Sequence, residues 1–117
     1  MKTEFDTMAG IMPLIHAALE KWGFESQSGM AIEECAEFIV ALRKMSRVGG
    51  RGLKPDAEAH AQDECADVMF TTLQMAVALG WDKVMERLQF KADRLEQRME
   101  PTKNFVLQSQ PSSRTNV

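Results

Sequence analysis

Hydrophobic residues recur at three- and four-residue steps in four stretches of the chain. This spacing is that of one face of an α-helix, so the pattern predicts four helices. The predicted helices cover residues 5–21, 27–46, 57–79 and 82–99. A glycine-rich stretch at residues 47–55, Arg-Val-Gly-Gly-Arg-Gly-Leu-Lys-Pro, interrupts the pattern and predicts a loop.

Glycine and proline predict where these helices begin and end. Gly23 follows Trp22 and is expected to end the first helix, and Gly80 is expected to end the third. Pro13 leaves two possibilities open for the first helix. Either this helix begins near Met12, with the proline in its first turn, or an earlier helix kinks at the proline.

The four helices predict a fold class and a division of the chain. Pro101 is expected to end the fourth helix, which separates a helical domain of residues 1–100 from a polar tail of residues 101–117. No stretch of useful length shows the two-residue alternation of a half-buried strand. We therefore expect an all-α fold, an antiparallel four-helix bundle. Because the third helix is apolar on nearly every side from Val68 to Leu79, it needs neighbours on both flanks, and a second subunit could supply some of them.

The second helix has a one-sided arc of apolar residues. The arc spans about 120° of the helix surface and is expected to face the core. Its members are Ala31, Cys35, Phe38, Ile39, Leu42 and Met45. Acidic residues lie on the other side, where Glu34 flanks the arc and Glu33 is furthest from it.

Composition and charge exclude several classes of protein. The chain has 117 residues with 44% hydrophobic content, which predicts one small globular domain. A net charge of −3 argues against general nucleic-acid binding. Cys35 and Cys65 lack the spacing of a zinc site and are expected to be reduced core residues of a cytoplasmic protein. No apolar run is long enough to cross a membrane, and no signal peptide is expected.

Two acidic motifs carry the strongest chemical signal. Glu34 and Glu37 are three residues apart, as are Glu64 and Asp67, so each pair lies on one face of its helix. Four converging carboxylates suit a hard divalent cation such as Mg²⁺. The alternative is a solvated acidic face, which is ordinary opposite a core arc. Against it, unpaired carboxylates on the otherwise buried third helix would be costly, and gathered like charges repel unless a cation is bound.

Basic residues form a stripe along the fourth helix that includes Lys91 and Arg94. Neighbours within the stripe, such as Lys83 and Arg87, carry like charges four residues apart. This spacing disfavours the interpretation that the stripe is a solvent-exposed face stabilised by ion pairs between residues four apart. The stripe is expected to face something anionic, and two candidates stay open: the acidic helices or a phosphate chain. Metal ions beside Lys and Arg side chains suit phosphoryl chemistry, because both neutralise phosphate oxygens.

At these residues the sequence resembles a known family. The pattern Glu33-Glu34-x-x-Glu37 followed by Glu64-x-x-Asp67 is similar to the signature of the all-α nucleoside triphosphate pyrophosphohydrolases. That superfamily includes MazG, dCTP pyrophosphatase, the dimeric dUTPases and phosphoribosyl-ATP pyrophosphohydrolase. The second helix, Met-Ala-Ile-Glu-Glu-Cys-Ala-Glu-Phe-Ile-Val-Ala-Leu, looks closest to short MazG-like proteins, and the resemblance covers residues 15–98.

The resemblance implies hydrolysis of an NTP or dNTP between the α and β phosphates, which gives the monophosphate and pyrophosphate. By the family pattern, the ligands of Mg²⁺, or of Mn²⁺ in its place, would be Glu34, Glu37, Glu64 and Asp67. Glu33 would lie just outside these ligands or help to activate the attacking water, and the pattern does not separate the two roles.

The resemblance also implies substrate contacts and an assembly. Lys91 and Arg94 match the basic positions of the family's last helix and would hold the phosphate chain. Trp22 and Gln27 lie where family members often contact the base, although the favoured interpretation of Trp22 is a core residue. His60 shares the acidic face and is expected to be peripheral or close to the phosphates. Family members usually form homodimers or dimers of dimers, with sites near the subunit interface.

Two other functions are compatible with a helical chain that carries such carboxylates. A ferritin-like di-metal oxidase needs Glu-x-x-His pairs, and the residues three before His16 and His60 are Pro13 and Ala57. That class is therefore excluded. A non-catalytic helical adaptor or regulatory subunit, whose charged residues meet a partner chain, stays open as the alternative.

Overall fold

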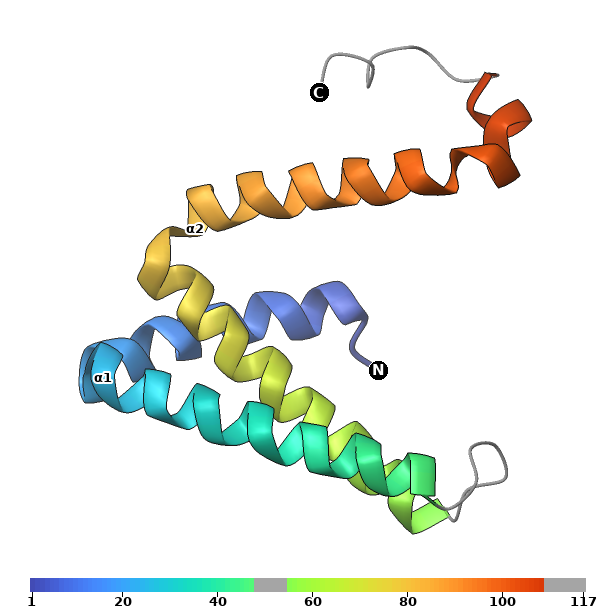
Figure 1. The fold of residues 1–117 in the computed structure, drawn as a ribbon. Helices are drawn as coiled ribbons and strands as arrows, with labels where there is room; N and C mark the ends of the chain where they lie inside the picture. The colour runs from blue at the N-terminus through green and yellow to red at the C-terminus, as the bar shows by residue number, and fades with distance from the viewer. Residues whose placement is uncertain (48–54, 109–117) are drawn as a thin grey trace. The chain divides into compact units, whose positions relative to one another are not determined.

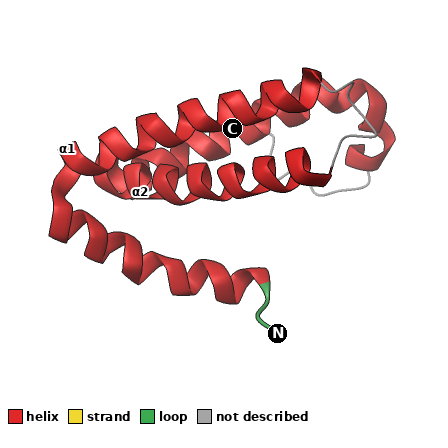
Figure 2. Cartoon of the chain, turned by 90° about the horizontal axis from the view of Figure 1, so that it is seen from below, coloured by secondary structure: helices red, strands yellow, loops and turns green. Residues whose placement is uncertain are grey.

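Two long α-helices make up the described chain. The structure is a computed structural model that describes residues 1–47 and 55–108. Helix α1 covers Glu4–Arg47 and helix α2 covers Pro55–Gln108 (Figure 1). The residues in these two ranges include no strand (Figure 2), which confirms the all-α prediction. The chain divides into two compact units, of which the first is Met1–Leu79 and the second begins at Gly80.

The predicted four-helix bundle is wrong for the single chain. Within the first unit, the part of α1 after Gly23 and the part of α2 before Gly80 pack together as an antiparallel helical hairpin. The glycines that were expected to separate four helices explain the difference. Gly23 has φ 85° and ψ 165°, and Gly80 has φ 115°. These backbone angles are open to glycine and costly for other residues. At Gly23 they redirect α1 without a separate loop.

The first helix begins well before its proline. Thr3 caps α1, because its hydroxyl accepts a hydrogen bond from the Asp6 backbone N–H at 3.1 Å, and the Asp6 carboxylate accepts one from the Thr3 N–H at 3.0 Å. The helix then runs through Pro13 and changes direction at Gly23 (Figures 1 and 2). Of the two possibilities left open for Pro13, the earlier start is confirmed, but the kink in α1 lies at Gly23 and not at the proline.

The far end of α2 differs from the prediction. The helix passes Pro101 and continues to Gln108, so the predicted end at Pro101 is wrong. A proline removes one backbone hydrogen bond and can kink a helix without ending it. The last part of the predicted tail, residues 109–117, and the glycine-rich residues 48–54 lie outside the described residues.

Small residues are buried on both arms of the hairpin. Ala41 of α1 and Ala61 of α2 are buried, and small side chains allow two helices to approach closely. Polar partners pair in reverse order along this contact, since Gln27 bonds to Gln74 near one end, and Glu37 lies near Glu64 further along. This order is that of an antiparallel pair, and it places both acidic motifs at one level of the hairpin.

The predicted core arc of residues 27–46 does not form the core of this hairpin. Ile39 is 61% exposed and Leu42 is 44% exposed, and Cys35 is exposed as well. The face turned to α2 instead carries Gln27, Glu34 and Ala41. The physical reason is that a hairpin offers one neighbour to each helix, so only one side of α1 can be covered. None of the helices in the described ranges has a stretch long and apolar enough to span a membrane.

Candidate metal centre

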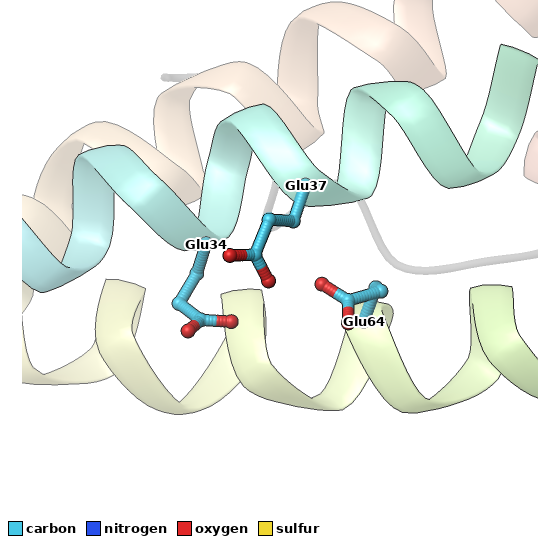
Figure 3. A group of neighbouring side chains, drawn as sticks. All are labelled: Glu34, Glu37 and Glu64. Carbon is cyan, nitrogen blue, oxygen red and sulfur yellow. The ribbon is translucent and has the colours of Figure 1, made fainter.

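Three glutamates from the two arms of the hairpin point toward one another. Glu34 and Glu37 come from α1 and Glu64 comes from α2 (Figure 3). One carboxylate oxygen from each lies within 4.8 Å of the others. The spacing of three residues on α1 therefore gathers both carboxylates on the face turned to α2, as the sequence predicted. Three of the four predicted metal ligands lie together here.

A second group of acids on α2 shares Glu64 with the first. Asp63, Glu64 and Asp67 bring one oxygen each within 4.8 Å of one another. The fourth predicted ligand, Asp67, thus lies beside Glu64, and its carboxyl is also within hydrogen-bonding reach of Glu34. Asp63 was not predicted as a ligand. The signal was present, because Asp63 and Asp67 are four residues apart and so share a helix face.

Burial singles out Glu64 within this cluster. Glu64 is 7% exposed, whereas Glu34 is half-buried and Glu37 and Asp67 are exposed. The Oε2 atoms of Glu64 and Glu34 are both buried and have no hydrogen-bond donor among the described residues. A buried polar atom without a partner is rare and costly in a folded protein. These two oxygens therefore need a proton or a cation.

The electrostatics of the cluster favour protonation when no cation is bound. Loss of hydration, followed by the charge of Asp67, raises the pKa of Glu34 above its ordinary value. Burial also raises the pKa of Glu64, and the neighbouring Glu37 adds to the rise through a hydrogen bond and through its charge. The positive charge of His60 acts in the opposite direction on the pKa of Glu64. A divalent cation would reverse these effects, because it favours the ionised form of each ligand.

An open hollow of about 310 Å³ lies beside the cluster. Its lining comes from both helices and combines apolar and ionisable side chains: Ala36, Glu37, Val40, His60 and Glu64. This volume is at the lower end of the range for small-molecule sites. The prediction that His60 lies near the acidic face is confirmed, since its ring lines the same hollow as two of the carboxylates. The apolar part of the lining was not predicted.

Two amide side chains meet near the other end of the contact. Gln27 and Gln74 are both buried, and Nε2 of Gln27 donates a hydrogen bond to Oε1 of Gln74 at 2.6 Å. Between this pair and the cluster, the hydroxyl of Thr71 donates to the carbonyl oxygen of Asp67 at 3.0 Å. Gln74 was missed by the sequence analysis, because a lone glutamine on an apolar helix gives no sign of its partner.

The other predicted site residues are distributed as follows. Glu33 is exposed and does not belong to either group of carboxylates within 4.8 Å. Trp22 is 57% exposed, and Nζ of Lys21 lies 5.2 Å from the centre of its ring. This exposure contradicts the interpretation of Trp22 as a core residue. Lys91 and Arg94 are exposed residues of the second unit, and their role toward the cluster stays a prediction.

A scan against models of protein families, a search of curated proteins and a search of solved structures each found no match for this chain.

The donor set of the cluster determines what it can do chemically. All its ligand atoms are carboxylate oxygens, which Mg²⁺, Mn²⁺ and Ca²⁺ prefer over nitrogen or sulfur. Exposed members at the rim, Glu37 and Asp67, leave one side open to water and to a ligand. The residues present thus fit a hard divalent cation that keeps some of its water. Such an arrangement suits the binding of phosphate oxygens.

Proposed function

We propose that this protein is a Mg²⁺-dependent nucleoside triphosphate pyrophosphohydrolase of the MazG-like kind. It takes up an NTP or dNTP and water and releases the nucleoside monophosphate and pyrophosphate. Glu34, Glu37, Glu64 and Asp67 are the proposed ligands, and Mn²⁺ is expected to replace Mg²⁺. Asp63, whose carboxylate lies beside Glu64 and Asp67, is a further candidate ligand.

The observation that carries the proposal is the burial of the Glu64 carboxyl group beside other carboxylates. Its side chain is buried in the hairpin, faces two other carboxylates and has no donor for Oε2 among the described residues. Structural acids in a helix contact normally meet a lysine, an arginine or a backbone N–H. A cluster that gathers negative charge without such a partner is destabilising unless a cation is bound. Binding of a cation would explain why the fold contains this cluster.

The chain's own residues have separable tasks in this proposal. When bound, Mg²⁺ neutralises phosphate charge and lowers the pKa of a coordinated water. The exposed carboxylates Glu37 and Asp67 orient the bound substrate at the open rim of the cluster. The exposed Glu33 has two roles that stay open, positioning of the ligands from outside or proton removal from the attacking water. In either case water adds to phosphorus, and the bond between the α and β phosphates breaks with pyrophosphate as the leaving group.

Substrate contacts outside the cluster follow from the family resemblance. Lys91 and Arg94 are proposed to hold the phosphate chain, and Trp22 offers an exposed aromatic face on which a base can stack. Gln27 is a weaker candidate for contact with the base, because its amide N–H already donates to Gln74 inside the helix pair. The hollow beside Glu37 and Glu64 is next to the proposed cation and is the natural place for part of the nucleotide.

The proposal is tested by product identity. Purified protein is incubated with a panel of NTPs and dNTPs plus Mg²⁺, and the products are separated by anion exchange. Formation of monophosphate and pyrophosphate in equal amounts is the expected result. Glu64→Gln should abolish it, whereas Glu58→Gln, which neutralises an exposed acid of the same helix, should not. Diphosphate with orthophosphate would contradict cleavage between the α and β phosphates, and no turnover with Mg²⁺ or Mn²⁺ would overturn the enzyme proposal.

The exposed apolar residues favour an assembly, and they also keep a second candidate function open. Large side chains that are mostly exposed occur throughout the described helices, among them Phe5, Leu14, Ile32, Ile39, Met69, Leu79 and Leu88. So much exposed apolar surface is typical of chains that bind a partner. We propose a homodimer or a dimer of dimers, in which a second copy covers this surface and completes a bundle of helices.

The alternative is a helical adaptor that uses the same surface for a different chain. Light scattering combined with size-exclusion chromatography separates the two. A dimer or tetramer of the purified chain supports self-assembly. A stable monomer that lacks nucleotide turnover would favour the adaptor.

A further inference from the structure

We propose that the buried amide pair Gln27–Gln74 sets the register of α1 against α2 and thereby positions the carboxylate cluster. Both glutamines act through the helices that carry them and are positioning residues. The proposal concerns the alignment of the helices, so it is tested without any metal. Its consequence for cation binding rests on the proposed function.

The amide pair is the directional contact of this hairpin. Gln27 is 7% exposed and Gln74 is 4% exposed, and the 2.6 Å hydrogen bond joins residues 47 positions apart in the chain. It joins uncharged groups of α1 and α2, whereas the Glu37–Glu64 and Glu34–Asp67 contacts join carboxyl groups, which bond to each other only when one of them is protonated. The Thr71 hydroxyl, by comparison, bonds to the backbone of its own helix.

The remaining contact does not fix an alignment. Beyond the turn at Gly23 its buried apolar residues are small, with Ala41 on α1 and Ala61 and Ala76 on α2, and the larger buried residue Ile15 lies on α1 before that turn. Alanine contacts are non-directional, so a helix shifted by one turn, about 5.4 Å, would still find a small side chain opposite it. Such a shift would separate Glu37 from Glu64, which now bring their oxygens within 4.8 Å.

Charge repulsion acts against the observed register. The register that gathers the carboxylates is the one in which they are closest, so a metal-free hairpin whose carboxylates are ionised lowers its electrostatic energy by sliding away from it. Something other than the cluster must therefore hold the helices in place before a cation arrives. A shift would leave the buried amides of Gln27 and Gln74 without partners, which carries a large penalty. A single buried polar pair fixes register in coiled coils for the same reason.

The test replaces both amides and measures the alignment directly. Replacement of both hydrogen-bonding partners by apolar residues of similar size is expected to preserve folding, so the variant is the double substitution Gln27→Leu/Gln74→Leu. Nitroxide labels are attached at Met30→Cys on α1 and Met69→Cys on α2, both exposed positions, in a background of Cys35→Ser and Cys65→Ser. The distance between labels is measured by pulsed electron paramagnetic resonance in metal-free buffer, with excess unlabelled protein to suppress distances between chains.

The expected results differ in the shape of the distance distribution. The parent, and the surface control Gln62→Leu, should each give one narrow distance. The double variant should keep its helical content and give a broader distribution or a second distance displaced by a helical turn. A double variant with the narrow distance of the parent would overturn the proposal. If the double variant does not fold, Gln74→Glu provides the test. It keeps an acceptor for Gln27 and should keep the narrow distance, and a broadened distribution would overturn the proposal.

A second measurement connects the register to the cluster. The affinity for Mn²⁺ of the double variant should fall roughly 10–100-fold, as is typical when residues that orient metal ligands are changed. Unchanged affinity together with an altered distance would contradict the positioning role. If the parent itself binds no Mn²⁺, the proposed function fails, and the distance measurement still decides whether the amide pair sets the register.

Discussion

Glu37 on α1 and Glu64 on α2 bring their carboxylate oxygens within 4.8 Å of each other across the hairpin, with Glu34 equally close. No described donor reaches Oε2 of Glu64 or of Glu34. This contact therefore destabilises the helix pair unless a proton or a cation neutralises it. This condition leads to predictions about pH, backbone and substrate that can each be tested separately.

The stability of the metal-free protein is predicted to depend on pH through Glu34 and Glu64. The pKa of each is raised in the folded state, so the folded protein binds more protons than the unfolded chain above the ordinary pKa of a glutamate, about 4.3. Stability from these groups is therefore fully present below that pH and is lost as the pH rises through the raised values. Urea unfolding in EDTA between pH 4 and 8 measures the effect.

The matched variant for this experiment is Glu64→Gln, which removes one of the two groups. Other acids titrate in the opposite sense, such as Asp6, whose pKa is lowered by hydrogen bonds from the backbone and hydroxyl of Thr3. The difference between parent and variant removes their contribution. Relative to the variant, the parent should lose stability as the pH rises, and Mg²⁺ should restore it. A difference that is constant with pH would contradict the raised pKa of Glu64.

The turn inside α1 is predicted to require glycine at residue 23. With φ 85° and ψ 165°, Gly23 occupies a region that other residues reach at a cost of about 1–3 kcal/mol, so Gly23→Ala should lower the free energy of unfolding by that amount. Gly29 lies in the regular part of the same helix with no atom within 4 Å of an added Cβ. Gly29→Ala should therefore stabilise the protein by about 0.5–1 kcal/mol. Equal effects of the two substitutions in urea unfolding would argue against the turn.

Arg94 is predicted to bind the phosphate chain of the substrate and not the metal. Arg94→Ala should raise KM for the nucleotide severalfold while the affinity for Mn²⁺ stays unchanged. Lys83→Ala is the control, because it removes a positive charge of the same helix whose side chain lies 3.8 Å from Glu86. Unchanged KM and kcat in Arg94→Ala would remove Arg94 from the proposed site, and a loss of Mn²⁺ affinity would assign it a different role.

Glu33 is predicted not to ligate the metal, since it is exposed and lies outside both groups of converging carboxylates. Glu33→Gln should leave Mn²⁺ affinity unchanged, and its effect on kcat then separates the two roles that stay open. A large fall in kcat would support activation of the water, and a small one would support positioning from outside. Weaker Mn²⁺ binding of this variant would show that the exposed carboxylate does reach the cation.

Local spacing was sufficient to predict the cluster but not the packing around it. Glu34 and Glu37 share a helix face by their separation alone, and the repeat at Glu64 indicated a partner helix. Gly23 does interrupt the helical backbone, as predicted. The four-helix bundle was wrong because helical periodicity does not tell how the segments before and after a glycine pack. Periodicity also favoured the apolar arc around Ile39 as the core, whereas the face of α1 turned to α2 carries Gln27, Glu34 and the buried Ala41.

Long-range pairing was the part that the sequence could not predict. Gln27 and Gln74 are 47 positions apart, and neither lies in a motif that indicates the other. Their hydrogen bond depends on how two helices align, which a single chain's periodicity leaves undetermined. The same holds for the hollow beside His60, whose apolar lining comes from both helices.

The most direct test of the cation site is the binding of Mn²⁺ to metal-free protein at neutral pH, followed by the electron paramagnetic resonance signal of free Mn²⁺. The parent should take up Mn²⁺, and Mg²⁺ should displace it. Glu64→Gln should weaken binding by at least about tenfold, whereas Glu58→Gln, an exposed acid on the same helix, should not change it. Equal affinity of the parent and Glu64→Gln, or no uptake of Mn²⁺ by the parent, would contradict the site.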